Sequence, residues 1–289
     1  MAFTWQGRTY SSKKFPVLET IFGLKTDNRT QRIGENIHFT LGDVSRAYRA
    51  CGISEPASIS NTILDLTRKD RGIDARLPRS IIDCGYDLRK KTGAASNREH
   101  FAGEFVYVGL GNSLESWLEW PNVPDRSITI DNRVPPKISQ LLSDDEGALF
   151  SVIDYCDALS YAMFGSADTV LRVQNPMKWQ PNEIDGLYFS DHDAGRQRLY
   201  PIEGKALSTG DDVNLEQMLG AYLTMKSRYP GMDIIPLGIQ MVGTGLRVAQ
   251  LTYTGDRLRL DTYIFVRINP AIQSWLGRGA VAEQMPPML

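Results

Sequence analysis

Three side chains that could carry out phosphate chemistry lie close together in the second half of this 289-residue chain: Asp185, Glu203 and Lys205. Short apolar runs flank the polar stretch 190–196, which has the composition of a turn. Positions 185 and 203 are equally distant from Ala194, so an antiparallel hairpin would set Asp185 across from Glu203. Glu203 and Lys205 are two residues apart and would share one face of a strand. The pattern therefore predicts two carboxylates and one ammonium group converging at one end of a sheet.

This trio of side chains suits a hard divalent cation. Mg²⁺ takes oxygen ligands and is commonly held by one or two carboxylates, with water and phosphate oxygens completing the shell. A metal ion held there could polarise a phosphate and lower the pKa of a bound water. The neighbouring lysine could hold or help to deprotonate the attacking water and offset developing negative charge. The alternative interpretation is an exposed strand whose carboxylate and lysine form a cross-strand ion pair.

The spacing of these residues resembles a known motif. Asp185 is followed by seventeen residues and then by Glu203-Gly204-Lys205, which is similar to the PD-(D/E)XK motif of restriction-endonuclease-like nucleases. Ile184 stands where the motif usually has proline, a departure that is common in the family. The resemblance implies that Asp185 and Glu203 bind Mg²⁺ and that Lys205 orients or activates the water.

Two predicted helices that flank the motif could supply further groups. In the family, the helix after the motif often places a polar residue at the site, and the candidates here are Gln217 and Glu216. The helix before the motif could add an acidic ligand from Glu146 or Asp154. The alternative for both of these acids is a solvated side chain without a catalytic role.

The predicted elements around the motif follow the order of that family's core, which is helix–strand–strand–strand–helix–strand. Apolar residues at helical spacing predict the two helices, and short apolar runs predict the strands. The resemblance covers about 145–245, and the hairpin that follows would extend the sheet or form a dimer surface. Outside the motif we predict a helix over 146–164, a strand over 169–173, a helix over 214–229, a strand over 233–242 and a hairpin over 252–268.

The first third of the chain is predicted to form a second domain that binds DNA. Residues 41–52 and 59–71 are predicted helices joined by a tight polar connector, the helix-turn-helix arrangement. Residues 81–93 and 103–108 could form a hairpin wing, so 30–110 as a whole resembles a winged-helix domain. The alternative role for such a helix pair is structural or dimerising. Six basic residues are the candidate DNA contacts: Arg68, Lys69, Arg71, Arg89, Lys90 and Lys91.

Composition and charge are compatible with this division. The chain is 42% hydrophobic and 23% charged, as is typical of globular proteins. Its net charge is −2, yet basic residues outnumber acidic ones over residues 1–100, which favours phosphate contact through that part. Three scattered cysteines fit neither a disulfide framework nor a zinc site. No apolar run reaches membrane-spanning length and the N-terminus lacks a signal-peptide core, so we expect a cytoplasmic protein that does not enter a membrane.

The sequence as a whole predicts a two-domain α/β protein. We expect a winged-helix-like DNA-binding domain over 1–112, a linker over 113–144 and a nuclease domain over 145–289, with a restriction-endonuclease-like mixed sheet flanked by helices. The predicted function is Mg²⁺-dependent cleavage of double-stranded DNA at a specific sequence by a homodimer, which most resembles a type II restriction endonuclease. The alternatives are a modification-dependent or phage-defence nuclease, and a non-catalytic winged-helix regulator.

Overall fold

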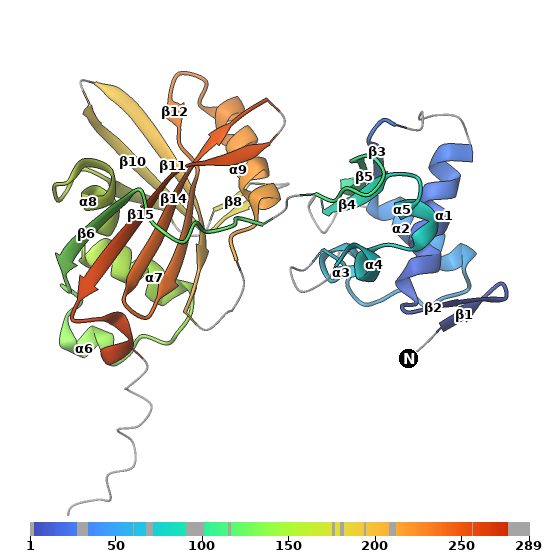
Figure 1. Ribbon diagram of the computed structural model, residues 1–289, viewed down its shortest axis with the longest axis horizontal. Helices are drawn as coiled ribbons and strands as arrows, with labels where there is room; N and C mark the ends of the chain where they lie inside the picture. The colour runs from blue at the N-terminus through green and yellow to red at the C-terminus, as the bar shows by residue number, and fades with distance from the viewer. Residues whose placement is uncertain are drawn as a thin grey trace, which may run out of the picture. The chain divides into compact units, whose positions relative to one another are not determined.

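The computed structural model divides the chain into two compact units, Met1–Glu115 and Ser116–Leu289 (Figure 1). Each unit has a hydrophobic core of its own. Among the residues with a described position, no helix is long and apolar enough to cross a membrane. The structure describes residues 3–27, 34–59, 61–67, 72–90, 101–114, 117–174, 177–179, 182–193, 195–207, 212–255 and 257–276.

The first unit packs helices against a small antiparallel sheet with the strand order β3-β5-β4. Leu18 of α1, Val44 of α2 and Phe105 of β5 are fully buried and belong to one core. A short hairpin, β1-β2, precedes α1. The elements of this unit are β1 (Phe3–Trp5), β2 (Arg8–Tyr10), α1 (Lys14–Asp27), β3 (Ile37–Thr40), α2 (Leu41–Ala50), α3 (Asn61–Leu64), α4 (Ile73–Arg76), α5 (Arg79–Ile82), β4 (Tyr86–Lys90) and β5 (Phe101–Tyr107).

The helix expected over 41–52 is present as α2, and local side chains fix both of its ends. The Thr40 hydroxyl accepts a hydrogen bond from the Asp43 N–H, and the Asp43 carboxylate accepts one from the Thr40 N–H at 2.7 Å. This reciprocal pair is a capping box. After the helix, Gly52 adopts a left-handed conformation with φ 65°, which stops it as the sequence predicts.

The second helix, expected over 59–71, is shorter than predicted. Within the described residues 61–67 only α3 is helical. The Leu66 N–H donates to the Ile63 carbonyl at 3.0 Å, and this three-residue spacing tightens and ends the turn. The remaining expected residues, 68–71, lie outside the described part of the chain.

The hairpin expected from 81–93 and 103–108 is present as β4 and β5, but its first strand begins later than predicted. The residues of α5 occupy the start of that range as a helical turn. Gly85, with φ 83°, then turns the chain into β4. The loop 91–100 between the two strands lies outside the described residues.

A buried ion pair connects three segments of this unit. Arg76 of α4 lies 2.8 Å from Asp87 Oδ2 of β4, and their side chains are 7% and 0% exposed. Asp87 also accepts hydrogen bonds from the backbone N–H groups of Leu88 at 2.7 Å and of Leu114 at 2.8 Å. The carboxylate is therefore fully satisfied as long as the arginine is present.

The second unit is built on an 8-stranded mixed sheet with the order β6-β15-β14-β13-β11-β10-β7, and β12 also pairs with β11. A separate pair, β8-β9, precedes β10. The elements are β6 (Arg126–Asp131), α6 (Pro136–Ser139), α7 (Glu146–Tyr155), α8 (Ala158–Phe164), β7 (Leu171–Gln174), β8 (Met177–Trp179), β9 (Asn182–Ile184), β10 (Gly186–Asp193), β11 (Arg196–Lys205), α9 (Leu215–Arg228), β12 (Asp233–Ile234), β13 (Leu237–Val242), β14 (Gly245–Tyr253), β15 (Leu258–Asn269) and the 3₁₀ turn η1 (Ile272–Ser274).

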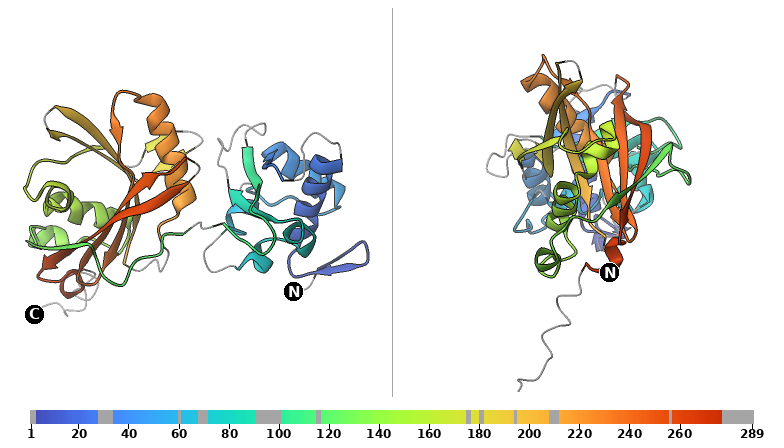
Figure 2. Two further views of the ribbon diagram at one scale, coloured as in Figure 1. Left: turned by 45° about the horizontal axis from the view of Figure 1, so that its top comes forward. Right: turned by 90° about the vertical axis from the view of Figure 1, so that its left-hand side faces the viewer.

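Helices cover both faces of this sheet (Figures 1 and 2). Tyr200 and Ile202 of β11 pack in the same core cluster as Leu149 of α7. Leu199, the residue before Tyr200, packs instead with Met225 of α9. Successive residues of a strand point to opposite faces, so even-numbered residues of β11 face α7 and odd-numbered ones face α9.

The element order predicted for this unit is present. The sheet runs β7-β10-β11 in antiparallel pairs, and β11 then pairs in parallel with β13 after the crossover helix α9. The strand expected over 233–242 is divided into β12 and β13. Pro236 lies at the interruption, where a residue without an N–H cannot donate to the sheet.

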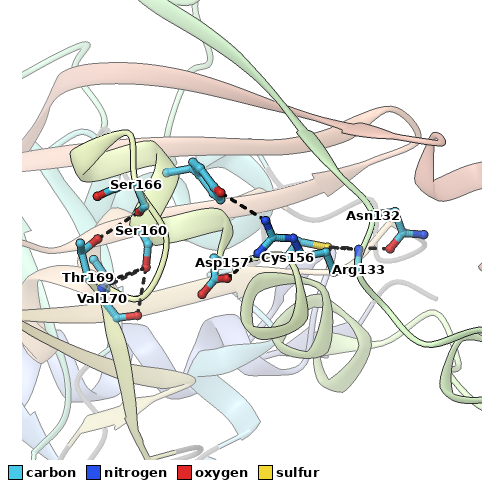
Figure 3. Close-up of polar contacts among 9 residues, drawn as sticks. Asn132, Arg133, Cys156, Asp157, Ser160, Ser166, Thr169 and Val170 are labelled. Atoms are coloured by element: carbon cyan, nitrogen blue, oxygen red, sulfur yellow. Dashed lines mark hydrogen bonds and ion pairs between the residues drawn. The ribbon is translucent and has the colours of Figure 1, made fainter.

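The helix expected over 146–164 is broken into α7 and α8. Asp157 sits at the break in a left-handed conformation with φ 51°, and Arg133 Nη1 pairs with its carboxylate at 3.2 Å (Figure 3). On α8, the Ser160 hydroxyl accepts from the Val170 N–H at 3.0 Å (Figure 3). The apolar periodicity continues across the break, which is why the sequence predicts one helix.

The stretch 113–144, expected to be a linker, differs from that expectation. It contains β6, which pairs in parallel with β15 at the edge of the main sheet, and the short helix α6. Before β6, the Leu118 N–H donates to the Val213 carbonyl at 3.0 Å. Its prolines resemble linker composition, but the segment is an integral part of the second unit.

The buried pair in the first unit yields a stability prediction. Changing Arg76→Met leaves the Asp87 carboxylate buried without its cation, and we expect a loss of ~3–5 kcal/mol in unfolding free energy. Urea denaturation of the full chain measures this. Arg79→Met is the matched control, because Arg79 pairs with Asp74 through side chains that are both 72% exposed, and it should change stability far less than Arg76→Met does. Equal effects of the two changes would contradict the prediction.

Candidate functional site

The pairing of β10 with β11 brings Asp185 to Glu203. The observed partners Gly186↔Ile202 and Leu187↔Pro201 have the register that the sequence predicts. Asp185 precedes β10, and its N–H donates to the Ile202 carbonyl at 3.2 Å. Its side-chain Oδ2 accepts from the Gly204 N–H at 2.9 Å. Two backbone hydrogen bonds therefore fix this aspartate beside the second acidic residue of the motif.

Glu203 and Lys205 lie on the face of β11 that α9 covers. Glu203 is 1% exposed, and its Oε1 lies 2.7 Å from Lys205 Nζ. The lysine side chain is 14% exposed, so the cluster is buried on the glutamate side and reaches solvent on the lysine side. The sequence prediction that these three residues converge is confirmed.

Gly204 has a packing reason to stand between Glu203 and Lys205. It faces α7, where an added Cβ would lie 2.7 Å from Leu149 Cδ2 and 3.4 Å from Phe150 Cζ. Both neighbours belong to the buried core of this unit. A larger residue at this position would force Leu149 to shift within the core, while the residues before and after Gly204 face the opposite side of the sheet.

The electrostatics of the cluster follow from its burial. Burial, followed by the charge of Asp185, raises the pKa of Glu203 to about 8. Burial alone would lower the pKa of Lys205, but the carboxylates of Glu203 and Asp185 outweigh it and raise that pKa. Without a metal ion, the two carboxyl groups therefore share a proton at neutral pH and Lys205 stays charged.

These residues fit a divalent cation. A buried pair of carboxyl groups that holds a proton at neutral pH can release it when a cation takes its place. Within the described residues, no group of three or more His, Cys, Asp or Glu side chains is arranged to hold a metal ion. Asp185 and Glu203 are two carboxylates, and Mg²⁺ can be held by one or two carboxylates while water and phosphate complete its shell.

The two acids of the preceding helix have different surroundings. Asp154 accepts a hydrogen bond from the Tyr188 hydroxyl at 2.7 Å and pairs with Arg172 at 2.9 Å. Tyr188 belongs to the core on the α7 face, so Asp154 lies on the other side of the sheet from Glu203. Glu146, at the start of α7, is close enough to raise the pKa of Lys205.

The polar residues of α9 are less closely tied to the cluster. Asn214 caps this helix by accepting from the N–H groups of Glu216 and Gln217, both at 3.0 Å. The Gln217 side chain is exposed. No described contact joins it to Asp185, Glu203 or Lys205.

The candidate DNA contacts of the first unit are only partly described. Arg68, Lys69, Arg71 and Lys91 lie outside the described residues. Arg89 pairs with Glu104 at 3.0 Å, with side chains that are 16% and 1% exposed. Lys90 is half-buried at the end of β4. Arg89 therefore has a structural partner that its sequence context does not reveal, because Glu104 is on the neighbouring strand.

A second polar group beside the cluster was not expected from the sequence. Gln240 of β13 pairs with Lys205 across the sheet, and Arg247 of β14 pairs with Gln240. Arg247 Nη1 donates to Gln240 Oε1 at 3.2 Å, and Gln240 Nε2 lies 3.5 Å from Asp212 Oδ1. The one signal in the sequence is a glutamine in the middle of an otherwise apolar strand.

The raised pKa of Glu203 predicts that metal-free protein loses stability as the pH rises. Between the ordinary value of 4.5 and about 8, the folded state binds more protons than the unfolded state, so stability falls as pH rises. Glu203→Gln should remove this fall. At pH 8 we expect the variant to be at least ~1 kcal/mol more stable, which is ~2–4 °C in Tm for a unit of this size.

Thermal unfolding in chelator between pH 5 and pH 8.5 measures this difference. Glu119→Gln is the matched control, because Glu119 is exposed and its change should leave the pH profile of the parent unaltered. A Glu203→Gln variant that is less stable than the parent at pH 8 would show that the glutamate is ionised and fully compensated in the folded protein.

Comparisons of the chain with protein-family models, with curated proteins and with solved structures find no match. A functional assignment therefore depends on the geometry of the cluster itself. That geometry is a half-buried aspartate, a buried glutamate and a partly exposed lysine, which lie together at the carboxyl end of one central strand.

Proposed function

We propose that this chain is a Mg²⁺-dependent nuclease that cleaves double-stranded DNA. The observation that carries the proposal is the convergence of Asp185, Glu203 and Lys205, with the Lys205–Glu203 contact at 2.7 Å and Asp185 fixed by the Gly204 N–H at 2.9 Å. A simple surface ion pair does not account for it, because Glu203 is 1% exposed. Burying two adjacent carboxyl groups costs stability, and a cation-binding role explains why this cost is tolerated.

The residues divide the work of hydrolysis between them. Asp185 and Glu203 would hold Mg²⁺, which supplies a Lewis acid for the phosphate and lowers the pKa of water. Lys205, charged and partly exposed, would orient the attacking water and offset negative charge on the phosphate as the P–O bond breaks. The hydrogen bond from the Gly204 N–H to Oδ2 fixes the Asp185 carboxylate beside Glu203, where the two would hold the cation together.

The topology around the cluster supports the same proposal. A helix, three antiparallel strands, a crossover helix and a parallel strand surround the motif in the order typical of restriction-endonuclease-like enzymes. The acidic and basic residues lie where β10 and β11 meet. Convergence of this order with the motif residues favours a nuclease over a non-catalytic regulator.

For the first unit we propose a role in binding DNA. Its order of α1, β3, α2, short helices, β4 and β5, with a sheet ordered β3-β5-β4, is typical of winged-helix domains. Two such chains, each cutting one strand, would suit a symmetric site. A dimer of this kind would act as a sequence-specific type II restriction enzyme, which is the most specific form of the proposal.

The catalytic proposal predicts cleavage that requires a divalent cation and Lys205. Plasmid DNA should be cut by the full chain with Mg²⁺ or Mn²⁺ and should stay intact in chelator. Lys205→Ala should lower the single-turnover rate at least ~100-fold, because the variant lacks a preorganised charge beside the phosphate. Its DNA affinity in Ca²⁺ should change little.

Lys137→Ala is the matched control, since Lys137 is exposed on α6, and it should cut as the parent does. Cleavage that persists in chelator would contradict the metal-dependent mechanism. Normal turnover by Lys205→Ala would leave the lysine with a structural role alone.

The DNA-binding proposal predicts which positive charges set the salt dependence of DNA affinity. Changing Arg68, Lys69 and Arg71 together to Gln should weaken binding to all duplexes alike. The slope of log K against log salt should fall by ~1 for each of these side chains that neutralises a phosphate in the parent complex. A control that changes the exposed Lys137, Arg257 and Arg259 to Gln alters the net charge equally. If both triple variants show the same slope, these residues of the first unit do not bind phosphates.

A further inference from the structure

We infer that Arg247 binds a backbone phosphate of the substrate, next to the phosphate at Asp185, Glu203 and Lys205, and that Gln240 positions it. This inference rests on the proposed nuclease function and extends its substrate site along the sheet. It assigns a role to a group that the motif does not include.

The strand register places Arg247 in line with the cluster. Lys205 pairs with Gln240, and Gln240 pairs with Arg247, so all three side chains leave the same face of the sheet. Neighbouring strands are ~4.8 Å apart, so the backbones of Lys205 and Arg247 are separated by roughly 10 Å. At this distance from the cluster, Arg247 can reach the phosphate next to the one at which Asp185, Glu203 and Lys205 would act.

Arg247 is oriented by neutral neighbours. Its Nη1 donates to Gln240 Oε1 at 3.2 Å, and its guanidinium lies 5.9 Å from the centroid of the Trp120 ring. Asp212 in turn orients Gln240, because its Oδ1 lies 3.5 Å from Gln240 Nε2. These contacts leave the remaining guanidinium N–H groups available in a fixed plane, the geometry that suits a phosphate.

Among the described residues, Arg247 contacts an amide and an aromatic ring. Within the described ranges, no carboxylate forms an ion pair with this half-buried arginine. A partly buried guanidinium that is held only by an amide and an aromatic ring retains its need for an anion. A nucleic-acid backbone at the adjacent cluster would supply one.

Trp120 gives the site a spectroscopic reporter. Its indole nitrogen is buried and forms no hydrogen bond with any described residue, while its ring lies beside Arg247. An anion bound by the guanidinium would change the electrostatic environment of this ring. The chain has five tryptophans, so the signal of Trp120 can be identified by comparison with Trp120→Phe.

The first experiment measures binding of the full chain to a duplex oligonucleotide in Ca²⁺ over a range of salt. Arg247→Met should weaken binding ~10- to 100-fold, the effect expected when hydrogen bonds to a charged group are removed, and should lower the salt slope by ~1. Arg247→Lys should keep the slope and recover only part of the affinity, because lysine keeps the charge but lacks the planar fork. Gln240→Leu, which removes only the positioning hydrogen bond, should weaken binding less than Arg247→Met does.

The matched control is Arg259→Met, an exposed arginine near the turn of the same hairpin, which should bind as the parent does. If the parent cuts DNA with Mg²⁺ while Arg247→Met binds and cuts normally, the inference is overturned and the proposed function stands. Thermal unfolding of each variant separates weaker phosphate binding from impaired folding.

The second experiment does not depend on cleavage. Protein labelled with 5-fluorotryptophan is titrated with inorganic pyrophosphate, and we expect the ¹⁹F resonance of Trp120 to shift in the parent and to stay fixed in Arg247→Met. If the resonance shifts but the protein cuts no DNA, the result supports the anion site and contradicts the proposed nuclease function. A resonance that does not move in the parent would overturn the phosphate-binding role of Arg247.

Discussion

The burial of Glu203 beside a second carboxyl group is the interaction that costs this protein folding free energy. A glutamate that is 1% exposed loses most of its hydration, and the charge of Asp185 adds to the penalty. The fold offsets this with the ammonium group of Lys205 and with a backbone N–H directed at Asp185. On the neighbouring strand, Gly238 pairs with Glu203 and packs closely against Val213, where an added Cβ would lie 2.8 Å from Cγ1. The site is held in place by packing on both faces of β11.

That constraint explains the layout of the sheet. β11 lies inside the sheet, with β10 on one side and β13 on the other, so its backbone is fixed in register from both directions. The α7 helix approaches the strand at Gly204, and α9 packs on the opposite face around Met225. Near the carboxyl end of β11 Lys205 is partly exposed, and Gln240 and Arg247 continue the row of polar side chains on the neighbouring strands. The catalytic proposal and the phosphate-binding proposal both use this one row of residues.

In the first unit, an excess of basic residues does not by itself identify a phosphate-binding surface. Its excess of basic residues suggests a phosphate-binding surface, yet Arg76 and Arg89 are occupied by Asp87 and Glu104 on its small sheet. These buried or half-buried pairs stabilise the unit by satisfying carboxylates that the sheet would otherwise bury alone. Arg89, a candidate DNA contact, is therefore already engaged by Glu104 within the fold.

Local sequence determined the features that depend on short-range geometry. The distance of Asp185 and Glu203 from one turn fixed the β10–β11 register, residue alternation set Glu203 and Lys205 on one face, and capping residues marked the ends of α2 and α9. Tertiary structure decided what depends on residues far apart in the chain. The helix is broken at Asp157, which adopts a left-handed conformation and pairs with Arg133, and β6 pairs with β15 where the sequence suggested a linker. Tertiary structure also placed Arg247 in line with Lys205, because strand order is set by packing over the whole sheet and leaves no periodic signal in any one segment.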